Sequence, residues 1–175
     1  MENNEFFGPE SSDYPEEFPT SKPIIKVIGV GGGGVNVVTE MFHQNLKDVD
    51  LMICNTDVQS LELSPVAEKI KLGGNLAKGL GAGCDPERGK LAAEASIPAI
   101  KESLSENTEM VFITACMGGG TGTGAAPVIA RVAKEMGKLT VAVVTIPFRD
   151  EGKEEVNRAM QGVRKLQKEV DSLLI

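Results

Sequence analysis

Glycine is concentrated in three stretches of this sequence, and each stretch follows a short apolar run. Fifteen of the 20 glycines lie at 29–34, 73–83 and 118–124. The last stretch holds five glycines and two threonines, between a predicted buried strand at 110–115 and an apolar helical run at 125–136. Glycine lets the backbone approach a ligand closely, and the free N–H groups at a helix start favour an anion. The pattern predicts phosphate-binding loops.

The rest of the chain alternates apolar strand patterns with helical ones. We expect strands at 24–30, 49–54, 67–72, 110–115 and 139–146, another beginning at 172, and helices at 35–46, 58–63, 85–106, 125–136 and about 154–170. Pro98 should kink or split the third helix. Strands with near-continuous apolar runs are typical of parallel sheets covered on both faces. The sequence therefore predicts an α/β fold with a Rossmann-like, doubly wound, mostly parallel sheet flanked by helices, all three glycine loops lying on one rim.

Composition excludes several classes of protein. The chain is 41% hydrophobic and 25% charged, which fits a soluble domain with one ordinary core. Residues 1–22 supply five of the seven net negative charges, so the body is nearly neutral. Without a basic excess, and with one tyrosine and no tryptophan, it does not resemble a nucleic-acid binder. No apolar run or signal-peptide pattern suggests membrane insertion, and three separated cysteines without a CxxC motif favour a reducing cytoplasm.

We expect residues 1–22 to form a disordered acidic tail and residues 23–175 to form the folded domain. The tail carries six acidic residues against one lysine and has no sustained hydrophobic period. It also contains four aromatic residues, Phe6, Phe7, Tyr14 and Phe18. Two interpretations of these aromatics remain open at this point: a tail free in solvent, or one that docks on a partner or on the domain.

Three glycine loops on one rim predict a polyanionic ligand such as a nucleoside di- or triphosphate. The sequence has no GxxxxGK[ST] motif, so backbone N–H groups, helix ends and Mg²⁺ would neutralise the phosphates. The spacing of Gly29, Gly31 and Gly34 also matches the dinucleotide fingerprint, which leaves an NAD(P)-binding oxidoreductase domain as an alternative. That fingerprint has no use for a second phosphate loop. Asp57 lies where it can hold a ribose or, equally, cap the 58–63 helix.

The 118–124 loop resembles the signature loop of the tubulin/FtsZ superfamily. The segments 26–34 with Asn36, 55–57, 78–83 and 125–127 resemble its bacterial FtsZ branch, and the resemblance runs from about residue 24 to residue 175. It implies a GTP- or GDP-binding, self-assembling GTPase of bacterial cell division, which uses Mg²⁺ and forms head-to-tail filaments of the division ring at midcell.

The resemblance also implies which residues bind the nucleotide. Gly32, Gly33 and Gly34 would approach the phosphates and Asn36 the guanine base. Ala82 and Gly83 would sit by the γ-phosphate, and Glu151 would bind the ribose. The 118–124 loop would surround the α- and β-phosphates. The full set of expected nucleotide-binding residues is Gly32, Gly33, Gly34, Val35, Asn36, Asp57, Ala82, Gly83, Gly119, Gly120, Thr121, Gly122, Thr123, Glu151 and Glu155.

The sequence departs from the bacterial FtsZ pattern in two respects. Glu155 stands where those proteins usually have an arginine, and Arg158, one helical turn later, is a candidate substitute. Alternatively, Glu154 and Glu155 only complement the helix dipole. The second departure is length, because the family continues through a central helix, a catalytic loop, a second domain and a tail that meets other division-ring proteins.

We therefore expect an incomplete GTP-binding domain that lacks the second domain and holds only the nucleotide half of an inter-subunit active site. We assign no catalytic and no metal-ligating residues, because no nucleophile–base pair occurs and His43 is predicted to be a surface residue. Such a chain would be inactive in GTP hydrolysis by itself. A non-hydrolysing regulator of filament assembly remains an alternative.

Overall fold

The structure is a computed structural model that describes residues 23–74, 79–104 and 106–175. The predictions for the 1–22 tail, and Lys78 of the 78–83 motif, lie outside the described residues. The elements in chain order are β1 (Ile25–Val30), α1 (Gly31–His43), β2 (Val49–Asn55), α2 (Val58–Leu63), β3 (Glu68–Lys71), α3 (Pro86–Ala95), α4 (Ile97–Ser103), β4 (Met110–Cys116), α5 (Gly120–Glu135), β5 (Leu139–Thr145), α6 (Lys153–Leu166) and β6 (Ser172–Leu174).

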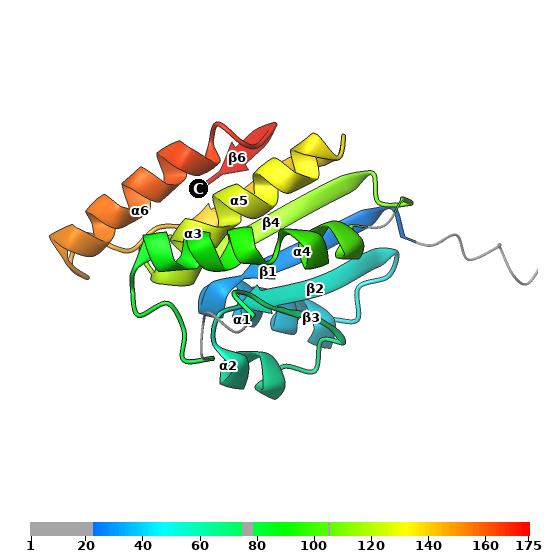
Figure 1. Cartoon of the computed structure of the whole chain (residues 1–175), viewed down its shortest axis with the longest axis horizontal. Coiled ribbons are helices and arrows are strands. Elements are labelled where there is room, and N and C mark those ends of the chain that lie inside the picture. The colour runs from blue at the N-terminus through cyan, green and yellow to red at the C-terminus, as the bar shows by residue number, and fades with distance from the viewer. Residues whose placement is uncertain (1–22, 75–78, 105) are drawn as a thin grey trace, which may run out of the picture.

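The six strands form one parallel sheet in the order β3-β2-β1-β4-β5-β6 (Figure 1). In the register of the central strands, Ile28 of β1 lies between Met52 of β2 and Ile113 of β4. Every crossover is made through a helix or a longer connection, as parallel pairing requires. The doubly wound parallel sheet predicted from the sequence is confirmed, with β3 at an edge as expected.

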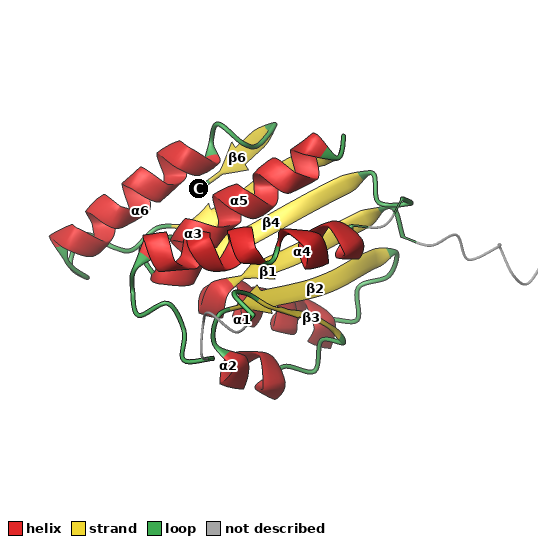
Figure 2. Ribbon diagram, viewed as in Figure 1, coloured by secondary structure: helices red, strands yellow, loops and turns green. Residues whose placement is uncertain are grey.

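Helices cover both faces of the sheet, α3 to α6 on one face and α1 with α2 on the other (Figure 2). Side chains of β1 alternate between the two cores: Ile28 and Val30 face the α5 side, and Val27 faces the α1 side. This alternation follows from the two-residue period of a strand. Two separate hydrophobic cores therefore hold the strand ends in fixed positions relative to the helices.

Two helices begin earlier than the sequence indicated, and both begin inside a glycine stretch. α1 starts at Gly31 rather than at residue 35, and α5 starts at Gly120 rather than at residue 125. Low helix propensity made these glycines look like loop residues. Tertiary packing overrides that propensity, since a side chain at Gly34 would overlap the Thr114 carbonyl and one at Gly124 would overlap the Pro86 carbonyl. Close helix–strand and helix–helix packing thus requires glycine in the first turns.

The helical spacing of apolar residues in the predicted 35–46 and 154–170 helices predicts that Phe42, Leu46 and Met160 pack on the sheet, but all three are exposed. Phe42, in the last turn of α1, and Leu46, beyond the helix end at His43, are each 43% exposed. In α6, which ends at Leu166, Met160 is exposed, and the buried face consists of Ala159, Gly162, Val163 and Leu166. The long helix predicted at 85–106 is split at Ser96, one residue before α4 begins, as Pro98 suggested.

Candidate functional site

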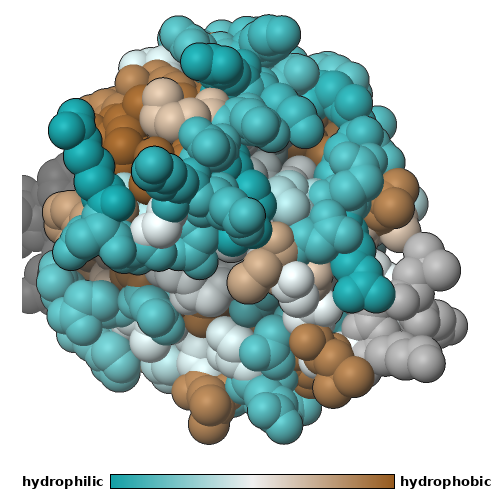
Figure 3. Space-filling model, turned by 90° about the vertical axis from the view of Figure 1, so that its left-hand side faces the viewer, coloured by the Kyte–Doolittle hydropathy of each residue, from teal (hydrophilic) through white to brown (hydrophobic). Residues whose placement is uncertain are grey.

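A cavity of about 240 Å³ lies at the carboxyl edge of the sheet, between the ends of β1 and β4. The chain leaves β1 for one face of the sheet and leaves β4 for the other, so the strand order reverses here. Open α/β sheets bind ligands at such a topological switch point. Figure 3 looks onto this edge, where pale surface of near-neutral hydropathy lies among hydrophilic residues and several hydrophobic patches. The cavity is lined by Val30, Gly31, Gly32, Gly33, Ala82, Gly83, Cys84, Cys116, Met117, Gly119, Gly120, Thr121 and Gly122.

The helices that start beside this cavity present unsatisfied backbone donors to it. Val30 precedes α1 and Gly119 precedes α5, and neither provides a side-chain cap. Neither helix has an acidic residue in its first turn. By contrast, Asp57 and Asp85 cap α2 and α3. Uncapped N–H groups and the positive end of the helix dipole make the cavity suited to an anion.

The two glycine-rich helix starts lie against each other. Gly31 has a φ of +71°, and a Cβ at this position would be 2.8 Å from the backbone nitrogen of Gly122. Gly118 has a φ of +112°, which is also in the left-handed region. Side chains at either position would be strained, and one at Gly31 would also collide with the facing loop. The sequence uses glycine here so that both loops can form one cradle.

Hydroxyl groups hold the 118–124 loop in place. The Oγ1 atoms of Thr56 and Thr121 are 2.7 Å apart in a buried hydrogen bond, and the backbone N–H of Gly118 donates to Thr123 Oγ1 at 2.8 Å. Thr56 follows β2, so the first bond joins the loops after β2 and β4. The two threonines predicted as ligand donors are therefore engaged within the protein, and Thr123 lies outside the cavity lining.

The third glycine loop reaches the cavity through backbone pairing with the end of β2. The N–H of Gly81 donates to the Thr56 carbonyl, and the N–H of Val58 donates to the Gly79 carbonyl, both at 3.3 Å. The Asp57 carboxylate accepts from the N–H of Gln59 at 3.0 Å, which confirms the helix-cap role. The alternative role of Asp57, holding a ribose, stays a prediction.

α6 is joined to the signature loop by Arg158. Its Nε donates to the carbonyl of Gly118 at 3.0 Å, and its Nη2 lies 3.7 Å from Glu155 Oε1. The predicted substitute for the family arginine therefore reaches the glycine loop itself. Glu151, in contrast, accepts a hydrogen bond from the N–H of Phe148 at 2.8 Å and is exposed.

The structure brings together just over half of the predicted nucleotide-binding residues. Those that line the cavity are Gly32, Gly33, Ala82, Gly83, Gly119, Gly120, Thr121 and Gly122. Gly34 and Val35 are buried inside α1, whereas Asn36 is exposed on it. The other predicted residues outside the lining are Asp57, Thr123, Glu151 and Glu155.

Sequence reasoning missed two thiols in the cavity wall. Cys84 and Cys116 both line it and are exposed, and a Cβ added at Gly33 would overlap the sulfur of Cys116. The available signal was position, because Cys84 directly follows Gly83 and Cys116 lies two residues before Gly118. Cys54 differs, since complete burial raises the pKa of its thiol far above the ordinary value. Among the described residues, no group of three or more His, Cys, Asp or Glu side chains is placed to bind a metal ion.

Comparison with known proteins identifies the family of this chain. A sequence profile described as the GTPase domain of the Tubulin/FtsZ family matches residues 24–175. The chain belongs to the tubulin/FtsZ family. The cell division protein FtsZ of Porphyromonas gingivalis is 54% identical over 153 residues, which cover 87% of this chain and 34% of that protein. The Aquifex aeolicus cell division protein FtsZ is 53% identical over 151 residues, covering 86% of this chain and 41% of that protein.

Solved structures of the tubulin/FtsZ family share the architecture. An empty FtsZ dimer from M. jannaschii superposes with a TM-score of 0.84 at 42% identity, covering 89% of this chain and 45% of that chain. A GTPγS-bound CetZ2 protofilament from Haloferax volcanii superposes with a TM-score of 0.76 at 27% identity, covering 85% of this chain and 47% of that chain. The chain thus spans a third to a half of the length of the relatives it matches. None of the helices in the described residues is long and apolar enough to cross a bilayer.

Proposed function

We propose that this chain binds GTP and GDP at the switch-point cavity and acts as the nucleotide-binding part of an FtsZ-type GTPase of bacterial cell division. The observation that carries the proposal is the pair of uncapped, glycine-built helix starts, α1 and α5, facing one cavity between β1 and β4. A cradle of backbone N–H groups suits a row of phosphates, which carries charge along its whole length.

In this proposal the cavity-lining glycines bind the phosphates. Gly32 and Gly33 of α1 would face the chain of phosphates from one side. Residues 119–122, at and just before the start of α5, would face it from the other side. Gly83, at the mouth of the third loop, would lie next to the γ-phosphate together with Ala82. The buried pair Thr56 and Thr121 fixes the spacing of the loops before any ligand arrives, which reduces the ordering cost of binding.

The base and the sugar would bind outside the phosphate cavity. Asn36 is exposed on α1 and offers an amide that both donates to and accepts from a base edge. Glu151 and Glu155 lie near the start of α6, where carboxylates can pair with ribose hydroxyls. Glu155 already lies close to Arg158, so its negative charge is partly balanced where the family usually has an arginine.

Mg²⁺ would arrive with the nucleotide. The described residues hold no cluster of three or more possible metal ligands, so phosphate oxygens and water would form most of its coordination shell. Its role would be to neutralise the β- and γ-phosphates, which the chain otherwise meets with backbone groups alone.

Hydrolysis would depend on assembly. The solved relatives include an FtsZ dimer and a CetZ2 protofilament. We propose that the protein to which this domain belongs also self-associates, in a head-to-tail manner, in the cytoplasm at the division site. Within the described residues, the cavity contains no histidine or carboxylate to activate water. A neighbouring subunit would supply that group. Family membership does not favour the NAD(P)-dependent oxidoreductase or the non-hydrolysing regulator.

Titration calorimetry with GDP, GTP and ADP, each with and without Mg²⁺, tests this proposal. We expect guanine nucleotides to bind at least tenfold more tightly than ADP, and we expect Mg²⁺ to strengthen GTP binding more than GDP binding. Equal affinities for GDP and ADP would refute a guanine site. A substantial GTPase rate from this chain alone, independent of protein concentration, would refute the proposed dependence on a neighbouring subunit.

A further inference from the structure

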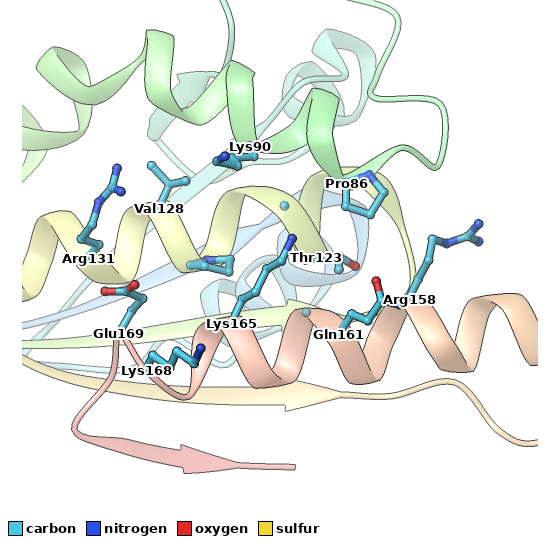
Figure 4. A pocket seen from close by; sticks show the side chains of 13 residues that line it. Pro86, Lys90, Thr123, Val128, Arg131, Arg158, Gln161, Lys165, Lys168 and Glu169 are labelled. Carbon is cyan, nitrogen blue, oxygen red and sulfur yellow. The ribbon is translucent and has the colours of Figure 1, made fainter.

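A second cavity, of about 220 Å³, lies between α3, α5 and α6, away from the nucleotide cavity (Figure 4). Its floor is apolar and comes from Pro127, Val128 and the small residue Gly162. Its walls carry cationic side chains from all three helices and from the turn after α6. These are Lys90, Arg131, Arg158, Lys165 and Lys168, against one acid, Glu169.

Two of these cations have no partner among the described residues. Lys90 lies 3.3 Å from a Glu87 oxygen, and Arg131 lies 3.9 Å from Glu135. Arg158 is occupied by the Gly118 carbonyl, as described above. Lys165 and Lys168 form no hydrogen bond or ion pair with any described side chain, and Figure 4 shows Lys165 extending from α6 across the cavity toward α5 and α3. The cavity therefore presents unpaired positive charge over an apolar floor.

We propose that the acidic N-terminal segment, residues 1–22, docks into this cavity in the same molecule. The segment carries six acids and one base, opposite in sign to the cavity walls. It also carries Phe6, Phe7, Tyr14 and Phe18, which match the apolar floor. Residues 23–175 carry a net charge of only −2, so most of the negative charge of the chain lies in this segment.

The segment is long enough to reach the cavity. Twenty-two residues span up to about 70 Å when extended, whereas a compact domain of this size has a radius of gyration of only about 15 Å. Covalent attachment also gives the segment an effective concentration in the millimolar range, so a weak interaction suffices for docking. The attraction should be sensitive to salt, because the lysines that carry it lie at the surface.

The composition of the chain supplies a reporter for this interaction. Tyr14 is the only tyrosine, and the chain has no tryptophan, so intrinsic fluorescence reports on the segment alone. We expect the fluorescence anisotropy of Tyr14 in the full chain to be high at about 10 mM salt and to fall by at least a third at about 0.5 M salt. The double variant Lys165→Glu/Lys168→Glu should show the low value at both salt concentrations.

A matched control variant makes the same change in net charge at two lysines outside the cavity. Lys47→Glu/Lys101→Glu alters two exposed lysines outside the cavity and should retain the wild-type anisotropy and its salt dependence. Circular dichroism establishes that each variant folds. If the Lys165/Lys168 variant does not fold, the single variants Lys165→Gln and Lys168→Gln serve instead, each with a partial loss of anisotropy expected.

Three outcomes would overturn the proposal. The first is equal anisotropy in the wild type and the Lys165/Lys168 variant at low salt. The second is an equal fall in the Lys47/Lys101 control, which would indicate a non-specific effect of net charge. The third is an anisotropy that rises with protein concentration over a tenfold range in the wild type but not in the Lys165/Lys168 variant, because the segment would then bind the cavity of a second copy instead of its own domain.

Discussion

The hydroxyl of Thr56, after β2, lies 2.7 Å from the hydroxyl of Thr121, in the first turn of α5. Both side chains are buried, and the bond spans 65 residues of sequence. It joins the loop that pairs with Gly81 to the glycine-rich start of α5. Two walls of the proposed nucleotide site are thereby held at a fixed spacing by one hydrogen bond in the protein interior.

Replacing either threonine with valine should destabilise the fold and leave its shape unchanged. Thr56→Val leaves the Thr121 hydroxyl without this partner, which costs about 1–3 kcal/mol of unfolding free energy. The double variant Thr56→Val/Thr121→Val should cost less than the two single changes together, because both polar groups are then gone. Urea denaturation of the four proteins measures the coupling, and strictly additive losses would show that the bond contributes nothing.

Alanine substitutions at two neighbouring glycines, Gly32 and Gly33, should affect nucleotide binding and stability differently. A Cβ at Gly32 would meet no atom within 4 Å outside its chain neighbours and its own helix backbone, whereas one at Gly33 would overlap Cys116. Gly32→Ala should therefore keep the wild-type melting temperature but bind GDP at least about tenfold more weakly, a loss of ~1.4 kcal/mol, because the methyl group occupies the cavity wall.

Gly33→Ala should instead lower stability by about 1–3 kcal/mol through overpacking. Adding Cys116→Gly should restore most of that loss, since the overlapping sulfur is removed. Differential scanning calorimetry and GDP titration of these variants give both quantities. Unchanged GDP affinity in Gly32→Ala would place the phosphates elsewhere, and failure of Cys116→Gly to restore stability would refute the packing argument.

The three cysteines should react with thiol reagents in two classes. Cys84 and Cys116 are exposed and should be alkylated quickly, whereas Cys54 is fully buried with a raised thiol pKa and should react only on unfolding. Saturating GDP should slow the alkylation of Cys116 at least tenfold, because its sulfur adjoins the phosphate-facing Gly33. Mass spectrometry of timed alkylation measures each site, with Cys54 in urea as the control. Equal rates at Cys116 with and without GDP would contradict the assignment.

Acid should destabilise the fold partly through Asp171. The backbone N–H of Thr140, and then Lys134, hold the pKa of this carboxyl below its ordinary value. Its contribution to stability is therefore fully present above the ordinary carboxyl pKa of about 4 and is lost as the pH falls through the lowered pKa. Asp171→Asn should be less stable than the wild type at pH 7, and the two should converge in acid. Parallel stability curves from pH 7 to pH 2 would contradict this.

The doubly wound parallel sheet and the positions of the glycine loops could be predicted from the sequence, because apolar runs and glycine clusters are local signals. It misplaced the starts of α1 and α5, since the glycines at Gly34 and Gly124 are helical only because a neighbouring backbone lies against them. No local pattern records such a contact.

Within the site, eight of the residues that the family resemblance assigned to nucleotide binding line one cavity. The hydroxyls of Thr121 and Thr123, however, form hydrogen bonds with Thr56 and with the backbone N–H of Gly118. Those bonds connect residues far apart in the chain or across a tight turn, and a single sequence does not reveal them. The same holds for Arg158, whose contact with Gly118 depends on how α6 packs beside α5.

Thermal unfolding in the presence of GDP or NAD tests the central claim most directly. A ligand at 100 times its dissociation constant stabilises the native state by about 2.7 kcal/mol, which corresponds to a rise in melting temperature of roughly 5–10 °C for a domain of this size. We predict such a rise with GDP and Mg²⁺, and no rise with NAD at the same concentration. An equal or larger rise with NAD would contradict a guanine nucleotide site between β1 and β4.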